Sequence, residues 1–346
     1  MEVVEVTGEL NNSYDVVVIG GGAAGLNGAL MLARARRSVL VVDAGTPRNA
    51  PAAGVHGLLG LDGTPPAELL ARGREEVRGY GGQVTTGEVS TVSMVSTTDS
   101  GFAVTLTDGR RARARRLLVT TGLVDELPEV TGLRERWGRD VLHCPYCHGW
   151  EVRDRTIGIL GGPMGMHQAL LLRQWSSEVT LFTHTMPEPD AEQAERLAAR
   201  GIEVVPGRVR ALEVHEDRLT GIRLEDGTVI DREALVVGPQ MVARAGFLRG
   251  LGLHPVEHPS GAGEHIVTDA SGRTEVPGVW AAGNATELMA QVGAAAAAGA
   301  GAGAQINADL ISEDTERELR VYRDPFSAES ESRLCAQVMG DRRHGM

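Results

Sequence analysis

The chain carries the sequence DVVVIGGGAAG at residues 15–25. Its first five residues are almost all apolar, as in a parallel strand that is buried on both faces. Gly20, Gly22 and Gly25 then fit the pattern G-x-G-x-x-G, and a helical stretch follows at residues 26–36. In this pattern the first glycine allows a tight turn, the second lets a pyrophosphate approach the backbone, and the third lets helix and strand pack closely. The stretch therefore predicts a strand–turn–helix unit that binds a dinucleotide.

A second apolar run, residues 39–42, ends at Asp43. A carboxylate at the end of this strand can accept hydrogen bonds from the ribose hydroxyls of an adenosine. The N-terminus of the helix adds unpaired N–H groups and positive partial charge for the phosphates. A glycine turn without a ligand is the alternative, but strand, helix and terminal acid together favour binding. The residues expected to contact the dinucleotide here are Gly20, Gly22, Ala23, Ala24, Gly25, Asp43 and Ala44.

A second unit of the same form begins at residue 156. The run TIGIL at residues 156–160 leads into two glycines, a helical stretch at residues 166–175 and a strand at residues 178–182. Strand, glycine turn, helix and strand therefore occur twice, which indicates an internal duplication of the fold. The predicted fold class is α/β, with two Rossmann-like dinucleotide-binding domains.

The rest of the chain predicts how the two domains are connected. Residues 83–119 are rich in Val and Thr, and we expect a small antiparallel insertion there. After the second unit the chain returns through VWAAGN at residues 279–284 to a helix of small residues at 291–310, and a polar tail is expected from about residue 313. We therefore expect a central domain, residues 123–240, inserted in a discontinuous first domain, residues 1–122 and 241–346.

The composition argues against several classes of function. The net charge of −12 disfavours nucleic acid or an anionic membrane as the main partner. The one basic stretch, residues 110–116, alternates arginine with alanine as a solvated strand face would. The first ten residues resemble no signal peptide, and no apolar stretch reaches the ~18 residues of a membrane span. We therefore expect a cytoplasmic protein, in which structural disulfides are rare.

Two of the three cysteines, Cys144 and Cys147, form a C-x-x-C within HCPYCHG at residues 143–149. Two thiols at this spacing can close a small disulfide ring, and the arrangement lowers the pKa of one of them. Because a thiolate is the attacking species in thiol–disulfide exchange, His143 and His148 are candidates for the base or a cationic partner. The segment therefore predicts redox chemistry at sulfur.

Three other interpretations of the C-x-x-C stay open. C-x-x-C-H also attaches c-type haem, but this chemistry normally needs an exported protein. A structural zinc site needs four ligands, and a second C-x-x-C is absent from the sequence. The pair could also be inert and buried, although its place just ahead of the second unit favours redox use. Cys335 has no visible partner in the polar tail, and we expect no metal site.

From about residue 14 to residue 310 the chain resembles the low-molecular-weight thioredoxin reductases. The resemblance rests on both glycine turns, the C-x-x-C, TTG at residues 120–122 and GVWAAG at residues 278–283. It implies that the first domain binds FAD and that the central domain binds NADPH. It also implies that Cys147 faces the flavin while Cys144 exchanges with substrate. Members of the family are usually dimers, so a homodimer is expected.

The resemblance implies further contacts to FAD outside the first glycine turn. The family carries Gly-Asp beside the flavin ribityl chain, and this sequence has Gly283-Asn284, which keeps a hydrogen-bonding side chain. The helix that follows would point its N-terminus at the flavin and favour an anionic reduced form. The additional cofactor-binding residues are therefore expected to be Gly122, Gly283, Asn284, Gln291 and Val292.

The NADPH site departs from the family pattern. In the second glycine turn, Pro163 stands where the family has the glycine that approaches the pyrophosphate, and proline also lacks an N–H donor. Met166 stands where a small residue lets helix and strand pack. Residues 183–185 read THT, where the family has His-Arg-Arg, so no guanidinium remains to pair with the 2′-phosphate. The sequence therefore predicts a disabled nicotinamide nucleotide site.

The segment CPYCHGWE at residues 144–151 resembles the dithiol oxidases of gliotoxin and holomycin biosynthesis. Those enzymes oxidise a small dithiol to a disulfide and pass the electrons through FAD to dioxygen. A histidine follows the second cysteine in that branch, so His148 is the expected proton-transfer residue, with His143 second. A natural-product dithiol and dioxygen are the expected partners. The alternatives are an NAD(P)H-dependent disulfide reductase and a redox sensor that performs no catalysis.

Overall fold

The computed structural model describes residues 10–11, 13–95, 101–324, 327–328, 331–332 and 335. The quoted glycine stretch forms the centre of its largest sheet. Strand β1 (Ser13–Ile19) lies between β2 (Val39–Asp43) and β6 (Arg111–Val119), and all three are parallel. The whole sheet has the order β3-β2-β1-β6-β5-β4, and the C-terminal β19 (Val279–Ala281) pairs with β6. As the sequence indicates, Val16, Val17 and Val18 are completely buried.

The expected antiparallel insertion at residues 83–119 is only partly correct. Strand β3 (Gln83–Thr86) extends the parallel sheet beside β2, and β6 is one of its central strands. Only β4 (Val89–Val95), β5 (Gly101–Leu106) and the start of β6 are antiparallel to one another. The prediction was too wide because alternation of Val and Thr indicates a strand but not the direction of its neighbours.

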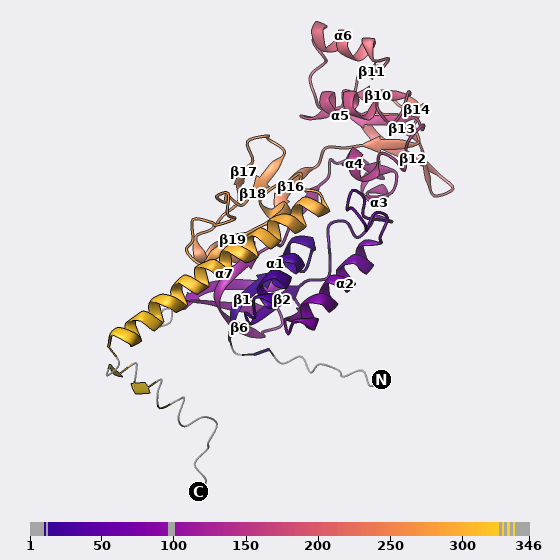
Figure 1. Ribbon diagram of the computed structural model, residues 1–346. Helices are drawn as coiled ribbons and strands as arrows, with labels where there is room; N and C mark the ends of the chain where they lie inside the picture. Colours follow the sequence, from indigo (N-terminus) through magenta and orange to yellow (C-terminus); the bar gives the residue numbers. More distant parts are fainter. Residues whose placement is uncertain are drawn as a thin grey trace, which may run out of the picture.

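Three helices cover one face of this sheet: α1 (Ala23–Arg34), α2 (Pro66–Gly79) and α7 (Val292–Arg323) (Figure 1). Helices α1 and α7 touch backbone to backbone. A Cβ on Gly299 would lie 1.9 Å from the carbonyl oxygen of Ala24, and one on Gly303 would lie 2.7 Å from that of Gly28. The small residues of α7 therefore allow the close packing that the sequence predicts.

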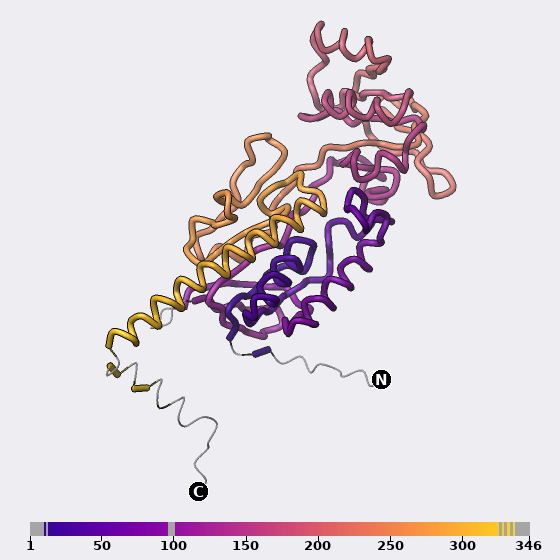
Figure 2. Tube along the Cα trace, in the orientation of Figure 1, coloured from indigo at the N-terminus to yellow at the C-terminus, as the bar shows by residue number. Residues whose placement is uncertain are grey.

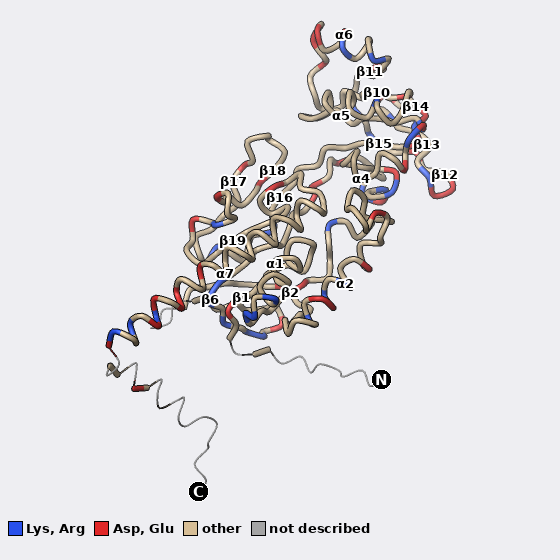
Figure 3. Tube along the Cα trace, viewed as in Figure 1, with Lys and Arg blue, Asp and Glu red and all other residues tan. Residues whose placement is uncertain are grey.

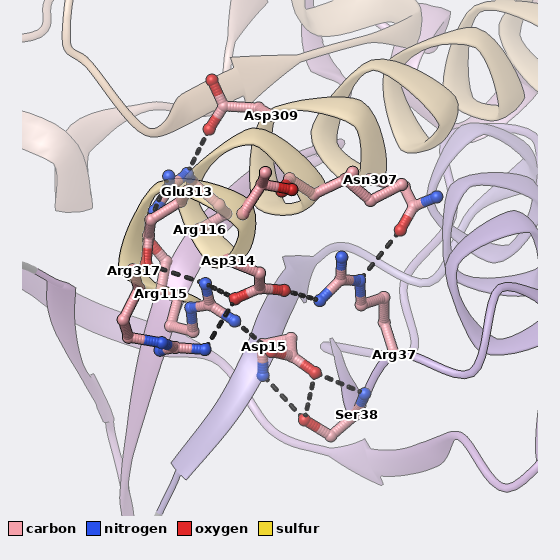
Figure 4. Close-up of polar contacts among 12 residues, drawn as sticks. Asp15, Arg37, Ser38, Arg115, Arg116, Asn307, Asp309, Glu313, Asp314 and Arg317 are labelled. Atoms are coloured by element: carbon pink, nitrogen blue, oxygen red, sulfur yellow. Dashed lines mark hydrogen bonds and ion pairs between the residues drawn. The ribbon is translucent and has the colours of Figure 1, made fainter. Parts of the chain in front are cut away.

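Helix α7 is longer than predicted, since its residues 313–323 are helical instead of a tail. Its outer half carries alternating acidic and basic side chains (Figure 3) and is held to the sheet by arginines (Figure 4). Asp314 accepts hydrogen bonds from Arg37 at 2.7 Å and Arg115 at 2.6 Å, while Arg116 pairs with Glu313 and, at 2.7 Å, with Asp309. The arginines of β6 were expected to be solvated, but two of them bind this helix.

Replacing Asp314 with asparagine is expected to lower the free energy of unfolding by about 1–2 kcal/mol, the usual cost of losing hydrogen bonds to charged groups. Burial alone would raise the pKa of Asp314, but the hydrogen bonds from Arg37 and Arg115 lower it below its usual range. The charged form therefore contributes stability above pH ~4, which is lost as the pH falls through the lower pKa of the folded state. Denaturant titrations at pH 7 and pH 3 should show a smaller difference between variant and wild type at the lower pH.

A second body, residues 127–239, lies at the opposite end from the outer half of α7 (Figure 2). Its parallel sheet has the order β11-β10-β9-β15-β8, with a three-stranded antiparallel sheet beside it. Strand β9 (Ile157–Leu160), helix α5 (Gly165–Leu172) and strand β10 (Val179–Phe182) form the second predicted unit. The other elements of this body are α3 (Leu133–Arg136), β8 (Val141–Leu142), α4 (Pro145–His148), α6 (Ala191–Ala199), β11 (Glu203–Val205), β12 (Val209–His215), β13 (Arg218–Leu224), β14 (Val229–Asp231) and β15 (Ala234–Val236).

Two antiparallel strands connect the bodies: β7 (Leu123–Glu126) leads out of the first and β16 (Gln240–Ala243) leads back. The predicted division at residues 122 and 240 falls beside these strands, and the assignment of domains stays a prediction. The remaining elements of the first body are η1 (Gly246–Leu251), β17 (Val256–Glu257), β18 (Gly263–His265) and η2 (Gly283–Ala285). Among the described residues, no helix has both the length and the apolar character needed to cross a membrane.

Candidate active site

A cavity of about 350 Å³ extends from the first glycine turn to the C-x-x-C. The first body contributes the β1–α1 turn, the end of β2 and the start of α7, and the second body contributes residues 137–138, 141–144 and 147–148. The structure thus brings together residues that are far apart in the sequence. The predicted residues that line the cavity are Gly20, Gly22, Ala23, Ala24, Asp43, Ala44, Gly122, His143, Cys144, Cys147, His148, Gly283, Asn284, Gln291 and Val292.

The first glycine turn leaves one position open toward the cavity. A Cβ on Gly25 would lie 1.8 Å from the carbonyl oxygen of Gly20, and one on Gly20 would lie 2.4 Å from that of Thr120. Gly25 therefore packs behind the turn and does not line the cavity. By contrast, a Cβ on Gly22 would meet no protein atom within 4 Å. Helix α1 also has no side-chain cap, so its first N–H groups are available to an anion.

The end of β2 provides a carboxylate beside this turn. Asp43 accepts a hydrogen bond from the backbone of Gly45 at 3.0 Å and lies at the edge of the cavity. A Cβ on Gly21 would lie 2.5 Å from the carboxyl carbon of Asp43, so only glycine at position 21 leaves room for this side chain. The pattern G-x-G-x-x-G leaves position 21 free, and sequence reasoning therefore missed this requirement.

Asn284 supports the loop that leads into α7. Its side-chain nitrogen lies 2.9–3.1 Å from three backbone carbonyl oxygens, those of Glu287, Leu288 and Ala290. Three acceptors around one atom identify that atom as the amide NH₂, since the amide oxygen would be repelled by all three. The amide thus stabilises the loop beside Gln291 at the N-terminus of α7.

Replacing Asn284 with aspartate is expected to lower the free energy of unfolding by about 2 kcal/mol, because it removes the donor and leaves the carbonyl groups unpaired. The side chains are nearly identical in shape, so packing is unchanged. Denaturant titration of the ligand-free protein measures the effect. An unchanged or higher stability would contradict the role assigned to the amide.

The two cysteines form a disulfide at the other end of the cavity, with their Cα atoms 5.3 Å apart. Cys144 precedes the short helix α4, whose first residue is Pro145, a residue preferred at that position because it has no N–H to satisfy. The backbone N–H groups of Cys147 and His148 both donate to the carbonyl oxygen of Cys144. Local backbone structure therefore holds both sulfur atoms beside the cavity.

The two flanking histidines lie in the same wall. Burial lowers the pKa of His143, the nearby guanidinium of Arg48 lowers it further, and one ring nitrogen lies 3.2 Å from the carbonyl oxygen of Val237. Burial also lowers the pKa of His148, whose Nε2 is buried without a hydrogen-bond partner among the described residues. Both rings are therefore largely neutral at pH 7, and His148 has a nitrogen that is free to accept a proton.

Sequence reasoning missed an ion pair in the cavity wall. Arg48 donates two hydrogen bonds to the carboxylate of Asp125, at 2.7 and 2.6 Å, and the Asp125 side chain is only 7% exposed. The pair joins the loop after β2 to the connecting strand β7. No local motif reveals it, because the two residues lie 77 positions apart.

The second glycine turn has a different environment. Among the described residues, none that lines the cavity comes from this turn. A Cβ on Gly161 would lie 2.2 Å from the carbonyl oxygen of Thr183, so the turn is closely packed against β10. His184 stands where the family pattern has arginine. Its ring accepts a hydrogen bond from the backbone N–H of Val209 at 3.1 Å. No group of three or more metal-ligating side chains occurs among the described residues.

Comparisons with known proteins agree with this architecture. Residues 14–299 match the family model described as pyridine nucleotide-disulphide oxidoreductase. The chain is 30% identical to the thioredoxin reductase sirT of Leptosphaeria maculans over 294 residues, 81% of this chain and 89% of that protein. It is 31% identical to the thioredoxin reductase tcpT of Claviceps purpurea over 283 residues, which cover 79% and 87% of the two chains.

Two solved structures are also similar. The crystal structure of HlmI matches with a TM-score of 0.85 and 45% identity over 92% of this chain and 99% of that one. An oxidoreductase from Agrobacterium tumefaciens matches with a TM-score of 0.80 and 39% identity, over 86% and 99% of the two chains. These matches confirm the predicted fold class and the resemblance to thioredoxin reductases.

Proposed function

Because the chain belongs to the pyridine nucleotide-disulphide oxidoreductase family, we propose that it binds FAD and oxidises a small dithiol to a disulfide with dioxygen. The observation that carries this proposal is the single cavity that joins a dinucleotide-type glycine turn to the Cys144–Cys147 disulfide. The resemblance of residues 144–151 to dithiol oxidases indicates the direction of the reaction. A homodimer and a natural-product substrate belong to the same proposal.

The residues of the first body fit FAD. The open face of Gly22 and the uncapped N-terminus of α1 suit a pyrophosphate, and Asp43 suits the ribose of the adenosine. Gln291 and Val292, at the N-terminus of α7, would lie toward the flavin. When bound, FAD supplies a two-electron acceptor that dioxygen can reoxidise.

The disulfide would receive the electrons of the substrate. A substrate thiolate attacks the sulfur of Cys144, and Cys147 leaves as a thiolate. The second substrate thiolate then displaces Cys144, so the substrate closes to a disulfide while the cysteine pair holds two electrons. When the Cys144–Cys147 bond closes again, these two electrons leave the cysteine pair for the acceptor. The overall reaction converts one dithiol and one dioxygen into one disulfide and one hydrogen peroxide.

His148 would move the protons that these steps release. Replacing it with glutamine is expected to lower the rate of flavin reduction by a dithiol about 100-fold, at the lower end of the effect of a general base. Because burial lowers the pKa of His148 below its ordinary value of 6.5, the loss of wild-type activity that protonation of His148 causes should appear at pH values below 6.5. A variant whose pH profile keeps this acidic decline would contradict the assignment.

An NAD(P)H-dependent disulfide reductase is the alternative. Pro163, which lacks an N–H donor, and the absence of arginine at residues 183–185 argue against it. Incubating the yellow protein with dithiothreitol in air distinguishes the two. Hydrogen peroxide formed without a nicotinamide nucleotide supports the oxidase, whereas rapid bleaching of the flavin by NADPH supports the reductase. If neither occurs, the protein is better described as a redox sensor.

A further inference from the structure

The loop between β2 and α2 forms a closed structure at residues 55–64. Its ends are joined by two backbone hydrogen bonds between Val55 and the segment Gly63–Thr64, each 2.8 Å long. Gly57, Gly60 and Gly63 have positive φ angles, which glycine adopts without strain. The conformation of the loop is therefore fixed by its own backbone. Residues that its side chains contact are held in place by the loop.

One side of this loop rests on the start of α7. A Cβ on Gly57 would lie 3.5 Å from the side-chain oxygen of Gln291, and a Cβ on Gly293 would lie 3.7 Å from Leu58. Gln291 is part of the cavity wall. The loop is thus fixed relative to the part of the first body proposed to face the flavin.

The other side of the loop reaches the segment that carries the cysteines. Nε2 of His56 lies 3.4 Å from a carboxylate oxygen of Glu151, a residue that follows α4 in the chain. Among the described residues, the other hydrogen bonds and ion pairs that residues 143–151 make outside this segment lie within the second body. The His56–Glu151 contact is therefore a direct polar connection between the two bodies.

A second carboxylate orients the histidine ring. Nδ1 of His56 lies 3.4 Å from Asp62, which also accepts a hydrogen bond from the backbone of Gly57 at 2.9 Å. This backbone hydrogen bond, together with His56 itself, lowers the pKa of Asp62, so the carboxylate is charged at neutral pH. The His56 side chain is 27% exposed, against 67% for Asp62 and 41% for Glu151. The ring is thus the most buried member of the group and lies between two acids.

We propose that His56 is a positioning residue that holds the disulfide segment in place by binding Glu151. His56 is not among the residues that line the cavity, and it acts through the carboxylate that follows α4. The expected effect of His56 on the rate of flavin reduction rests on the proposed function. The contact between the two bodies does not, because it exists whatever the substrate is.

The test uses His56→Ala, Glu151→Ala and the double variant, with His56→Gln as the conservative replacement that can still donate to a carboxylate. His215→Ala is the matched control, since His215 also lies beside a glutamate, Glu216, at 3.7 Å but on an exposed hairpin of the second body. Hydrogen–deuterium exchange is followed in the peptide that contains residues 149–156, with and without bound flavin. Stopped-flow absorbance follows flavin reduction by dithiothreitol without oxygen.

We expect His56→Ala to speed exchange in that peptide about threefold to fivefold, although the substitution lies in the other body. In His56→Ala, flavin reduction at saturating dithiol should slow by a similar factor, with an unchanged KM. The double variant should be no slower than either single variant. His56→Gln should recover most of the rate. Exchange as in the His215→Ala control, additive effects in the double variant, or an unchanged rate of reduction would each overturn the proposal. If dithiothreitol fails to reduce the wild-type flavin, the proposed function fails, and the exchange measurement alone then decides whether His56 connects the bodies.

Discussion

Replacing Cys147 with serine is expected to lower dithiol-dependent oxygen consumption by a factor on the order of 1,000 or more, as loss of a covalent participant usually does. Serine has nearly the same size but cannot form the disulfide that the structure places beside the cavity. Bound flavin should be retained, because the proposed cofactor contacts lie in the first body. Oxygen uptake with dithiothreitol as substrate measures the loss, and the absorbance of the protein near 450 nm reports its flavin content.

The control for this variant is Cys335→Ser, because Cys335 is exposed and unpaired and lies outside the cavity. It should keep wild-type activity. Cys144→Ser should be as inactive as Cys147→Ser, but the two should differ toward an aromatic disulfide reagent. If Cys144 is the exchanging sulfur, Cys147→Ser forms a stable mixed disulfide faster than Cys144→Ser does. Equal turnover of wild type and Cys147→Ser would rule out the proposed chemistry.

The parts of the site that were predictable from the sequence are those with a local cause. Glycine is required at position 25 because a Cβ there would lie 1.8 Å from the carbonyl oxygen of Gly20, and such a constraint within one turn leaves a fixed spacing in the sequence. The C-x-x-C is equally local, because both sulfur atoms are carried by one short helix. These features identified both ends of the cavity.

The parts that were missed depend on residues that meet only after folding. The Arg48–Asp125 pair joins positions 77 residues apart, and the His56–Glu151 contact joins the two bodies. Neither has a characteristic spacing, because each partner lies in a loop or at an element end whose path is set by packing. The extension of α7 to Arg323 was missed for a similar reason, since its polar residues are stabilised by arginines of β6.

Replacing Gly22 with alanine is expected to weaken FAD binding about 1,000-fold, or about 4 kcal/mol, while leaving the flavin-free protein as stable as wild type. The reason is that a Cβ at this position meets no protein atom within 4 Å, and the φ angle of −80° suits any residue. Added volume here would therefore conflict only with a ligand at the N-terminus of α1, where a pyrophosphate must approach the backbone closely.

Gly25→Ala is the matched control, because its Cβ would lie 1.8 Å from the carbonyl oxygen of Gly20 and 2.6 Å from the hydroxyl of Thr120. It should destabilise the flavin-free protein, which Gly22→Ala should not. Fluorescence titration with FAD and thermal unfolding of the flavin-free protein separate the two effects. If Gly22→Ala bound FAD as tightly as wild type, the pyrophosphate would have to lie elsewhere. The open face of the first glycine turn would then have another purpose, and the proposal that electrons pass from the disulfide to a flavin in this cavity would lose its physical basis.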